Sequence, residues 1–251
     1  MTIKIAETLG APVKYIGAAA LFMIAASQTN ADETKPQSWQ SLIDMSRADV
    51  STFSLKLIND GADVGSMTYG WVRDGNRYIV SDRTEMKPNI IETAKGVINA
   101  GTLLPESITV DFAVGENKRK YNVAWAGSSR TGGVEISQPD AETRTVDFGS
   151  AEHPASALRL SIFGLIAGLP LKEGFAVKMP WYNTLSNKLQ DIELTHDGIT
   201  TVETPAGTFE AHKIDLTGGT PENIIYVSTG FPQKIVRIDV VGQPMHFERL
   251  P

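Results

Sequence analysis

Cysteine is absent from all 251 residues of the sequence. The absence excludes disulfide bonds, and it excludes a lipid-modified cysteine of the kind that anchors lipoproteins. Because no covalent cross-link can hold the fold together, the hydrophobic core has to supply its stability. We therefore expect a well-packed protein that is not a lipoprotein.

The sequence also lacks basic clusters and long hydrophobic runs. Its formal net charge is −6, and no run of four or more Lys or Arg residues occurs. Nucleic acid and anionic membrane surfaces are therefore not expected as partners. The longest apolar run, Ile16–Ala26, would span about 17 Å as a helix. This is well short of the roughly 30 Å hydrocarbon core, so we expect no stable membrane span.

The first 31 residues have the pattern of a secretory signal peptide. Lys4 and Lys14 give a weakly basic start, Ile16–Ala26 is the apolar segment, and Thr29-Asn30-Ala31 forms the cleavage position. The sequence has no Asn-x-Ser/Thr acceptor site for glycosylation, which fits a bacterial envelope. We predict export to the periplasm with cleavage after Ala31.

The predicted organisation is a signal peptide over residues 1–31, a polar lead with a short helix over 32–49, and a single β domain over 50–251. Apolar residues at near-helical spacing predict the short helix within Ser38–Ala48. From Val50 onward, apolar and polar residues alternate with a period of two, which is typical of strands with one face in the core. The sequence therefore predicts a mainly β fold.

Three Asp-Gly pairs predict tight hairpins, because this dipeptide readily adopts the positive φ angles that match the twist of paired strands. They lie in Asn59-Asp60-Gly61, Asp74-Gly75-Asn76 and His196-Asp197-Gly198. The segment Ile90–Asn99 fits either a strand or a helix, and Gly127–Gly133 reads as a loop. From Ile199 the sequence predicts a series of short antiparallel strands, turning at Pro205-Ala206-Gly207.

One segment interrupts the strand pattern. Pro154–Gly168 is apolar on nearly all sides of a helix, and Arg159 is its single charge. Burying its six large apolar side chains would contribute about 9–18 kcal/mol, so this helix has to be covered on most sides. We predict a curved antiparallel sheet, an open half-barrel, that wraps one buried apolar helix.

Several segments together resemble a family of exported bacterial β-rich domains of unknown function. They are Gly101–Ser107, the apolar helix, Leu169–Gly174 and, most specifically, the hairpin Thr201–Ala211 with its Thr-Pro-Ala-Gly-Thr-Phe turn. That family is similar in architecture to the periplasmic lipoprotein carriers, which are open half-barrels curled around helices. The resemblance covers roughly residues 50–250. It implies a fold and no catalytic residues.

Known catalytic and metal-binding motifs are missing. The four histidines, His153, His196, His212 and His246, are not spaced as local metal-ligand pairs, and no nucleophile elbow or phosphate-binding loop occurs. We therefore expect a protein that is not an enzyme and has no metal or cofactor. A hydrolase with a Ser-His-Asp triad assembled from distant residues is a less favoured alternative.

Aromatic residues near the predicted core elements are the candidates for ligand contacts. They either fill the space between sheet and helix or line an apolar cavity there. The residues that we select as a candidate ligand site are Trp71, Trp125, Phe163, Trp181 and Tyr182. The function predicted from the sequence is an exported, non-catalytic protein that binds a lipid, an acyl chain or another hydrophobic small molecule. The alternative is an assembly factor that binds another envelope protein.

Overall fold

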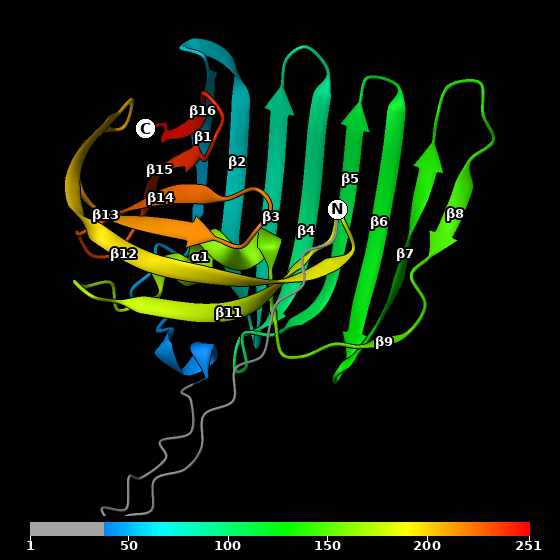
Figure 1. Cartoon of the computed structure of the whole chain (residues 1–251), viewed down its shortest axis with the longest axis horizontal. Coiled ribbons are helices and arrows are strands. Elements are labelled where there is room, and N and C mark those ends of the chain that lie inside the picture. Colours follow the sequence, from blue (N-terminus) through cyan, green and yellow to red (C-terminus); the bar gives the residue numbers. More distant parts are fainter. Residues whose placement is uncertain (1–37) are drawn as a thin grey trace, which may run out of the picture. The chain divides into compact units, whose positions relative to one another are not determined.

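Antiparallel strand pairing dominates residues 38–251, the part of the chain that the computed structural model describes. These residues belong to one compact unit. The predicted signal peptide, with its cleavage position after Ala31, lies outside the described residues. The described part is mainly β, as expected, and forms one open sheet (Figure 1).

The strands in chain order are β1 (Thr52–Asn59), β2 (Ala62–Asp74), β3 (Arg77–Met86), β4 (Ile90–Asn99), β5 (Pro105–Val114), β6 (Asn117–Ala126), β7 (Ser129–Ser137), β8 (Arg144–Asp147), β9 (Ala151–Glu152), β10 (Ala157–Leu158), β11 (Ala176–Asn183), β12 (Lys188–Thr204), β13 (Gly207–Thr217), β14 (Asn223–Ser228), β15 (Ile235–Val240) and β16 (Met245–Arg249). The helical segments are two 3-10 turns, η1 (Trp39–Leu42) and η2 (Arg159–Ser161), and the α-helix α1 (Ile162–Ala167).

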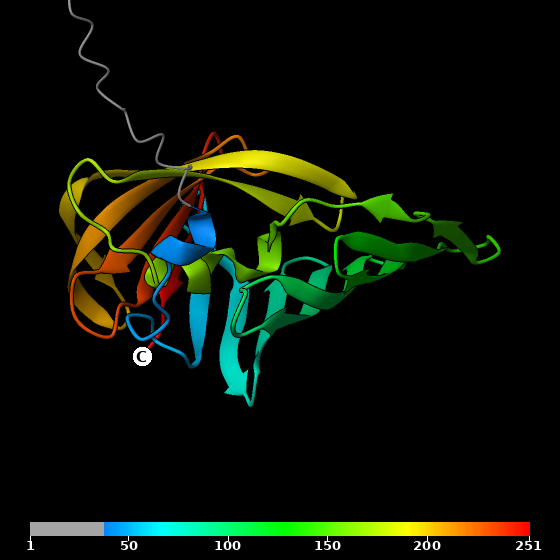
Figure 2. The same cartoon turned by 90° about the horizontal axis from the view of Figure 1, so that it is seen from below.

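The order of the strands in the sheet follows their order in the chain within two series, and one pairing joins the two series. Strands β1 to β8 follow one another in the sheet, and so do β11 to β16, while β16 pairs with β1 and joins the two series. All these pairs are antiparallel, whereas the short β10 pairs in parallel with β11. Seen from below, the C-terminal series curls over and the strands toward β8 extend away from the curl (Figure 2).

Two of the predicted Asp-Gly hairpins are present. Asp60 and Gly61 have φ angles of 50° and 76°, which is the geometry of a tight turn between β1 and β2. Gly75, with φ of 57°, lies in the turn between β2 and β3. The ambiguous segment Ile90–Asn99 is strand β4, and the predicted turn at Pro205–Gly207 joins β12 to β13.

The third Asp-Gly hairpin was predicted wrongly. Strand β12 runs without interruption through His196, Asp197 and Gly198, and its pairing with β13 shifts there by a β-bulge. Gly198 does have a positive φ of 88°, but the residues on both sides continue to pair with the same neighbour. The turn preference of Asp197-Gly198 therefore produces a β-bulge within one strand and not a hairpin between two. The predicted loop at 127–133 is also wrong beyond its start, because β7 begins at Ser129.

The two predicted helices are much shorter than expected. The N-terminal helix is the single 3-10 turn η1, and the apolar helix reduces to the six residues of α1 preceded by η2. Upstream of η2, Ala157 and Leu158 pair as β10 with Trp181 and Tyr182. A fully buried strand and a fully buried helix are equally apolar, so composition did not separate them.

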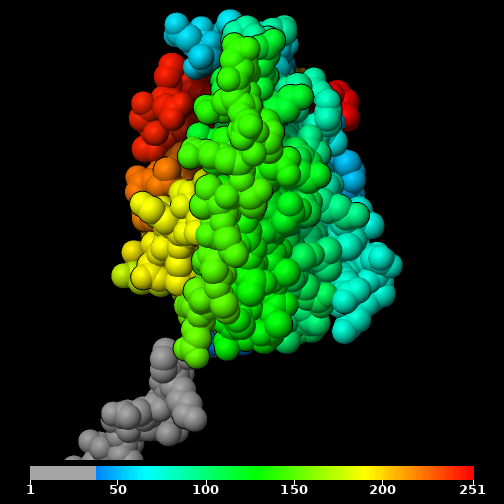
Figure 3. Space-filling view, turned by 90° about the vertical axis from the view of Figure 1, so that its right-hand side faces the viewer, coloured from blue at the N-terminus to red at the C-terminus, as the bar shows by residue number. Residues whose placement is uncertain are grey.

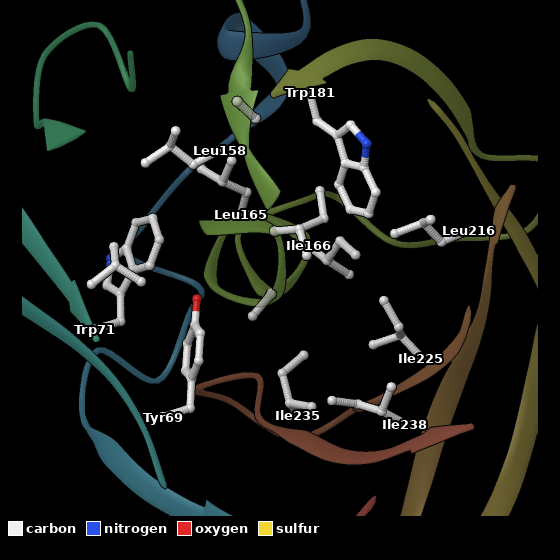
Figure 4. Packing of buried hydrophobic residues seen from close by; sticks show 14 of the residues in the cluster. Tyr69, Trp71, Leu158, Leu165, Ile166, Trp181, Leu216, Ile225, Ile235 and Ile238 are labelled. Carbon is white, nitrogen blue, oxygen red and sulfur yellow. The ribbon is translucent and has the colours of Figure 1, made fainter. Parts of the chain in front are cut away.

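Helix α1 nevertheless belongs to the core. Its side chains Ile162, Leu165 and Ile166 are buried in the same hydrophobic cluster as residues from both strand series. Gly164 lies so close to the indole ring of Trp71 that a Cβ atom there would overlap the ring. Figure 4 shows Leu165 and Ile166 between Tyr69 and Trp71 on one side and Trp181, Leu216, Ile225 and Ile238 on the other.

Candidate functional site

A cavity of about 200 Å³ lies between η2, α1 and the inner face of the sheet. Its apolar wall is formed by side chains from both strand series and from the helical segment. This wall includes Met67, Leu160, Ile162, Phe163, Trp181 and Phe247. Polar residues also line the cavity, among them the charged or ionisable Asp82, Glu92 and Arg159, together with Thr84, Thr184 and Asn223. The combination of an apolar surface with a few convergent polar groups is typical of small-molecule sites.

The alternation along β3 places Asp82 on the inner face. Tyr78, Val80 and Asp82 are the buried residues of this strand, each separated from the next by a residue that points the other way. In the pairing with β4, Thr84 lies opposite Glu92, so Glu92 joins the same face. A carboxyl group thus occupies a position where the strand pattern would place an apolar side chain.

Only some of the polar groups in the cavity pair with one another by hydrogen bonds or opposite charges. Arg159 donates a hydrogen bond from Nη2 to Glu92 Oε1 at 3.0 Å. Thr84 donates from its hydroxyl to Asp82 Oδ1 at 2.9 Å. Burial, followed by the neighbouring Glu92 carboxylate, raises the pKa of Asp82 to about 7. Within the described residues, no Lys, Arg or His forms an ion pair with Asp82, which is 8% exposed.

Tyr69 fixes the helical segment to the sheet beside the cavity. Its hydroxyl donates to the carbonyl oxygen of Leu160 at 2.9 Å, and its ring packs edge-on against Phe163 with centroids 5.5 Å apart. Burial raises the pKa of Tyr69, so the hydroxyl stays neutral. On the opposite wall, Trp181 donates from Nε1 to Gln190 Oε1 at 3.0 Å. Both aromatic walls are therefore held in place by hydrogen bonds.

The structure separates the five aromatic residues predicted as a ligand site. Phe163 and Trp181 line the cavity together. Trp71 is 1% exposed and packs against Gly164 and Tyr78, so it belongs to the core. Trp125 lines a second, smaller cavity of about 150 Å³. Tyr182 is also 1% exposed and lies beside Trp125, with ring centroids 5.4 Å apart.

Trp125 and Tyr182 form a second cluster with His153 and Arg130. The rings of Trp125, His153 and Tyr182 meet edge-on, and Arg130 donates to the Tyr182 hydroxyl at 2.9 Å. Burial lowers the pKa of His153, and its Nδ1 lies 3.2 Å from Ser156 Oγ. Its Nε2 has no hydrogen-bond partner in the described structure. Within residues 38–251, the cluster therefore contains a Ser and a His but no carboxylate hydrogen-bonded to the His, as a hydrolytic triad requires.

Two histidines come together that the sequence spacing did not pair. Nε2 of His196 lies 3.0 Å from Nδ1 of His212, across the bulge between β12 and β13. Burial, followed by the charge of His196, lowers the pKa of His212. Among residues 38–251, no group of three or more His, Asp or Glu side chains is arranged to hold a metal ion.

Sequence analysis missed Asp82, Glu92 and Arg159. Two signals in the sequence could have found Arg159 and Asp82. Arg159 is the single charge in an apolar segment, and Asp82 continues the inward-facing series Tyr78 and Val80.

No helix in the described part of the chain is long and apolar enough to cross a membrane.

Comparison with curated proteins gives no match. Among solved structures, the chain is similar to a β-barrel-like protein of the domain of unknown function DUF1849 from Brucella abortus. The identity is 7% and the TM-score 0.47, and the match covers 80% of this chain and 94% of that one. The family described as "Protein of unknown function (DUF3108)" matches residues 50–246. The match spans most of the sheet, from β1 to the start of β16, and the chain belongs to this family.

Proposed function

We propose that this protein is a non-catalytic binding protein that takes the apolar part of an amphipathic ligand into the cavity beside α1. The observation that carries the proposal is the cavity itself, which is lined by Phe163 and Trp181 together with polar groups from β3, β4 and η2. The hydrogen bonds that fix Tyr69 and Trp181 support it, because they set the orientation of these wall side chains before a ligand binds.

The size of the cavity limits the ligand. Its volume of about 200 Å³ is below the roughly 300–1,000 Å³ of pockets for drug-sized molecules. It equals the space of about seven water molecules, which suits an alkyl chain of about six carbons or the end of a longer chain. Burying six methylene groups would contribute about 5 kcal/mol before the cost of association.

The proposed location of the protein in the cell rests on the sequence. The pattern of residues 1–31 supports export to the periplasm, where lipids and acyl chains of the envelope would be the ligands. The curl of the sheet beside α1 supports the half-barrel architecture in which sheet and helix form two walls of one site (Figure 2).

The experiment is a titration of the isotopically labelled protein with 1-hexanol, followed by NMR shifts of backbone amides. We expect saturable shifts confined to residues that line the cavity, and weak binding, because the cost of association offsets most of the free energy of burial. Met245 is half-buried and lines the cavity, so Met245→Trp should fill it and weaken binding at least tenfold. Val241→Trp, at an exposed position outside the cavity, is the matched control. Absence of saturable shifts, or equal binding by both variants, would refute the proposal.

A second candidate function is binding of a partner protein through the edge of the sheet. All four residues of β8 are exposed, and β7 is its only strand partner in the described chain. Figure 3 views the molecule from the side on which β8 lies. The green surface that includes β8 faces the viewer there, and no other described segment covers it. A free edge can accept an extended strand of another protein.

A photo-reactive amino acid at Thr145 in β8 tests this candidate. It should cross-link to one dominant envelope protein in cells, while the same group at Thr109, an exposed position on β5, which is paired on both sides, should not. Equal cross-linking at both positions, or none at either, would exclude the edge as a docking strand.

A further inference from the structure

Asp82 is a cavity-lining carboxyl group whose counterion is missing from the described residues. Its side chain is nine-tenths buried, and Oδ1 accepts the hydrogen bond from Thr84. No hydrogen bond or ion pair in residues 38–251 engages Oδ2. Buried carboxylates are normally paired with a cation or supplied with several donors, because an unpaired ion is costly to remove from water.

The nearby arginine does not fill this role. Arg159 lies within hydrogen-bond distance of Glu92 instead. When both carboxyl groups are ionised, two negative charges face one positive charge, and the polar side of the cavity carries a net charge of about −1. This charge would repel an anionic headgroup, whereas a cationic group would neutralise it.

Building on the binding function proposed above, we infer that the ligand carries a primary ammonium group next to its apolar chain and that Asp82 is the counterion of this group. The alkyl chain lies against Phe163 and Trp181, and the ammonium group donates to the free oxygen of Asp82. A charge-assisted hydrogen bond in a site of low water content is stronger than a neutral one, and it gives selectivity for amines over alcohols of the same length.

The same arrangement makes binding sensitive to pH. The groups that face Asp82 are Glu92 from β4, Arg159 from η2, Tyr69 from the neighbouring β2 and Thr84 on its own strand. Of these, Glu92 disfavours the ionised form of Asp82 and Arg159 favours it. Since only ionised Asp82 pairs with an ammonium group, and its pKa lies near 7, acidification weakens amine binding. Between pH 8 and pH 6 the ionised fraction falls about tenfold.

The test compares hexylamine, 1-hexanol and hexanoate at pH 8 and pH 6 by NMR titration of the purified protein. At pH 8 we expect hexylamine to bind about tenfold more tightly than 1-hexanol, and hexanoate more weakly than either. At pH 6 hexylamine should lose about tenfold in affinity, while 1-hexanol should change little.

Asp82→Asn should bring hexylamine to the affinity of 1-hexanol and remove its pH dependence. Retained binding of 1-hexanol shows that the variant keeps its fold and cavity. Asp111→Asn, an exposed carboxylate on β5, is the matched control and should behave as the unmodified protein. Equal affinities for amine and alcohol at pH 8, or an unchanged preference in Asp82→Asn, would overturn the inference and leave the binding function intact. Failure of all three probes to bind would overturn both.

Discussion

A single buried carboxyl group, Asp82, links the candidate site to the stability of the fold. Its pKa rises from 3.8 to about 7, because burial and the nearby Glu92 disfavour the charged form. The folded state therefore binds a proton more tightly than the unfolded state does. The stability gained from this proton is fully present below about pH 4, and it is lost as the pH rises through 7.

We predict that Asp82→Asn stabilises the protein in a pH-dependent way. The amide is neutral at every pH, so the variant avoids the cost of a buried carboxylate. Urea unfolding should show a gain of about 4 kcal/mol at pH 8 and a much smaller difference at pH 4. Asp111→Asn on the exposed face should show neither effect. A difference between variant and unmodified protein that is the same at both pH values would contradict this prediction.

At the residue scale, the sequence predicted which faces are buried better than it predicted which residues meet. Of the five aromatic residues chosen as candidate ligand contacts, Phe163 and Trp181 line the cavity, whereas Trp71 is part of the packed core. The approach of Arg159 to Glu92 joins residues 67 positions apart. It depends on the register between β3 and β4 and on the path of η2, and local patterns contain neither.

Helix α1 shows how tertiary contacts set the length of an element. An apolar stretch of fifteen residues predicted a helix over 154–168, but only Ile162–Ala167 is α-helical. Ala157 and Leu158 pair with β11 instead, which satisfies their backbone groups in the sheet. Hydrophobicity identified the segment as buried, and the available strand edge determined its conformation.

The close approach of α1 to the sheet leads to a second prediction. Gly164→Ala adds a methyl group that would overlap the Trp71 ring, and this ring is itself packed against Tyr78 with centroids 5.3 Å apart. Overpacking should cost about 1–3 kcal/mol in unfolding free energy, in spite of the better helix propensity of alanine. Gly230→Ala, where no atom lies within 4 Å of the added carbon, should have little effect. Equal stability of the two variants in urea unfolding would show that α1 can move away from the sheet.

For the described part of the chain taken as a whole, local patterns predicted a mainly β fold with an open antiparallel sheet. Most neighbours in the sheet are consecutive strands joined by turns, and turn residues such as Asp60 and Gly61 identify these connections. The pairing of β16 with β1 was not predictable in this way, because it joins residues almost two hundred positions apart. That one contact joins the C-terminal series to the N-terminal series in a single sheet.

The open sheet should be unevenly stable from one end to the other. Strands β14 and β15 are paired on both sides, and buried residues such as Ile225 and Ile238 lie along them. At the other end, β8 has four exposed residues and a single neighbour. Local opening requires little free energy where few apolar contacts break, so the sheet should open first at β8.

Hydrogen exchange followed by NMR measures this gradient directly. We expect amides of β14 and β15 to exchange only on global unfolding, and those of β8 to exchange at least about a thousandfold faster. Mild urea should accelerate exchange at Ile225 and Ile238 strongly, because their opening exposes the whole core, and should barely affect Thr145. Equal protection and equal urea dependence at both ends would mean that the sheet unfolds as one cooperative unit. In that case β8 would be held by contacts beyond its pairing with β7, and it would be a poor docking edge for a partner strand.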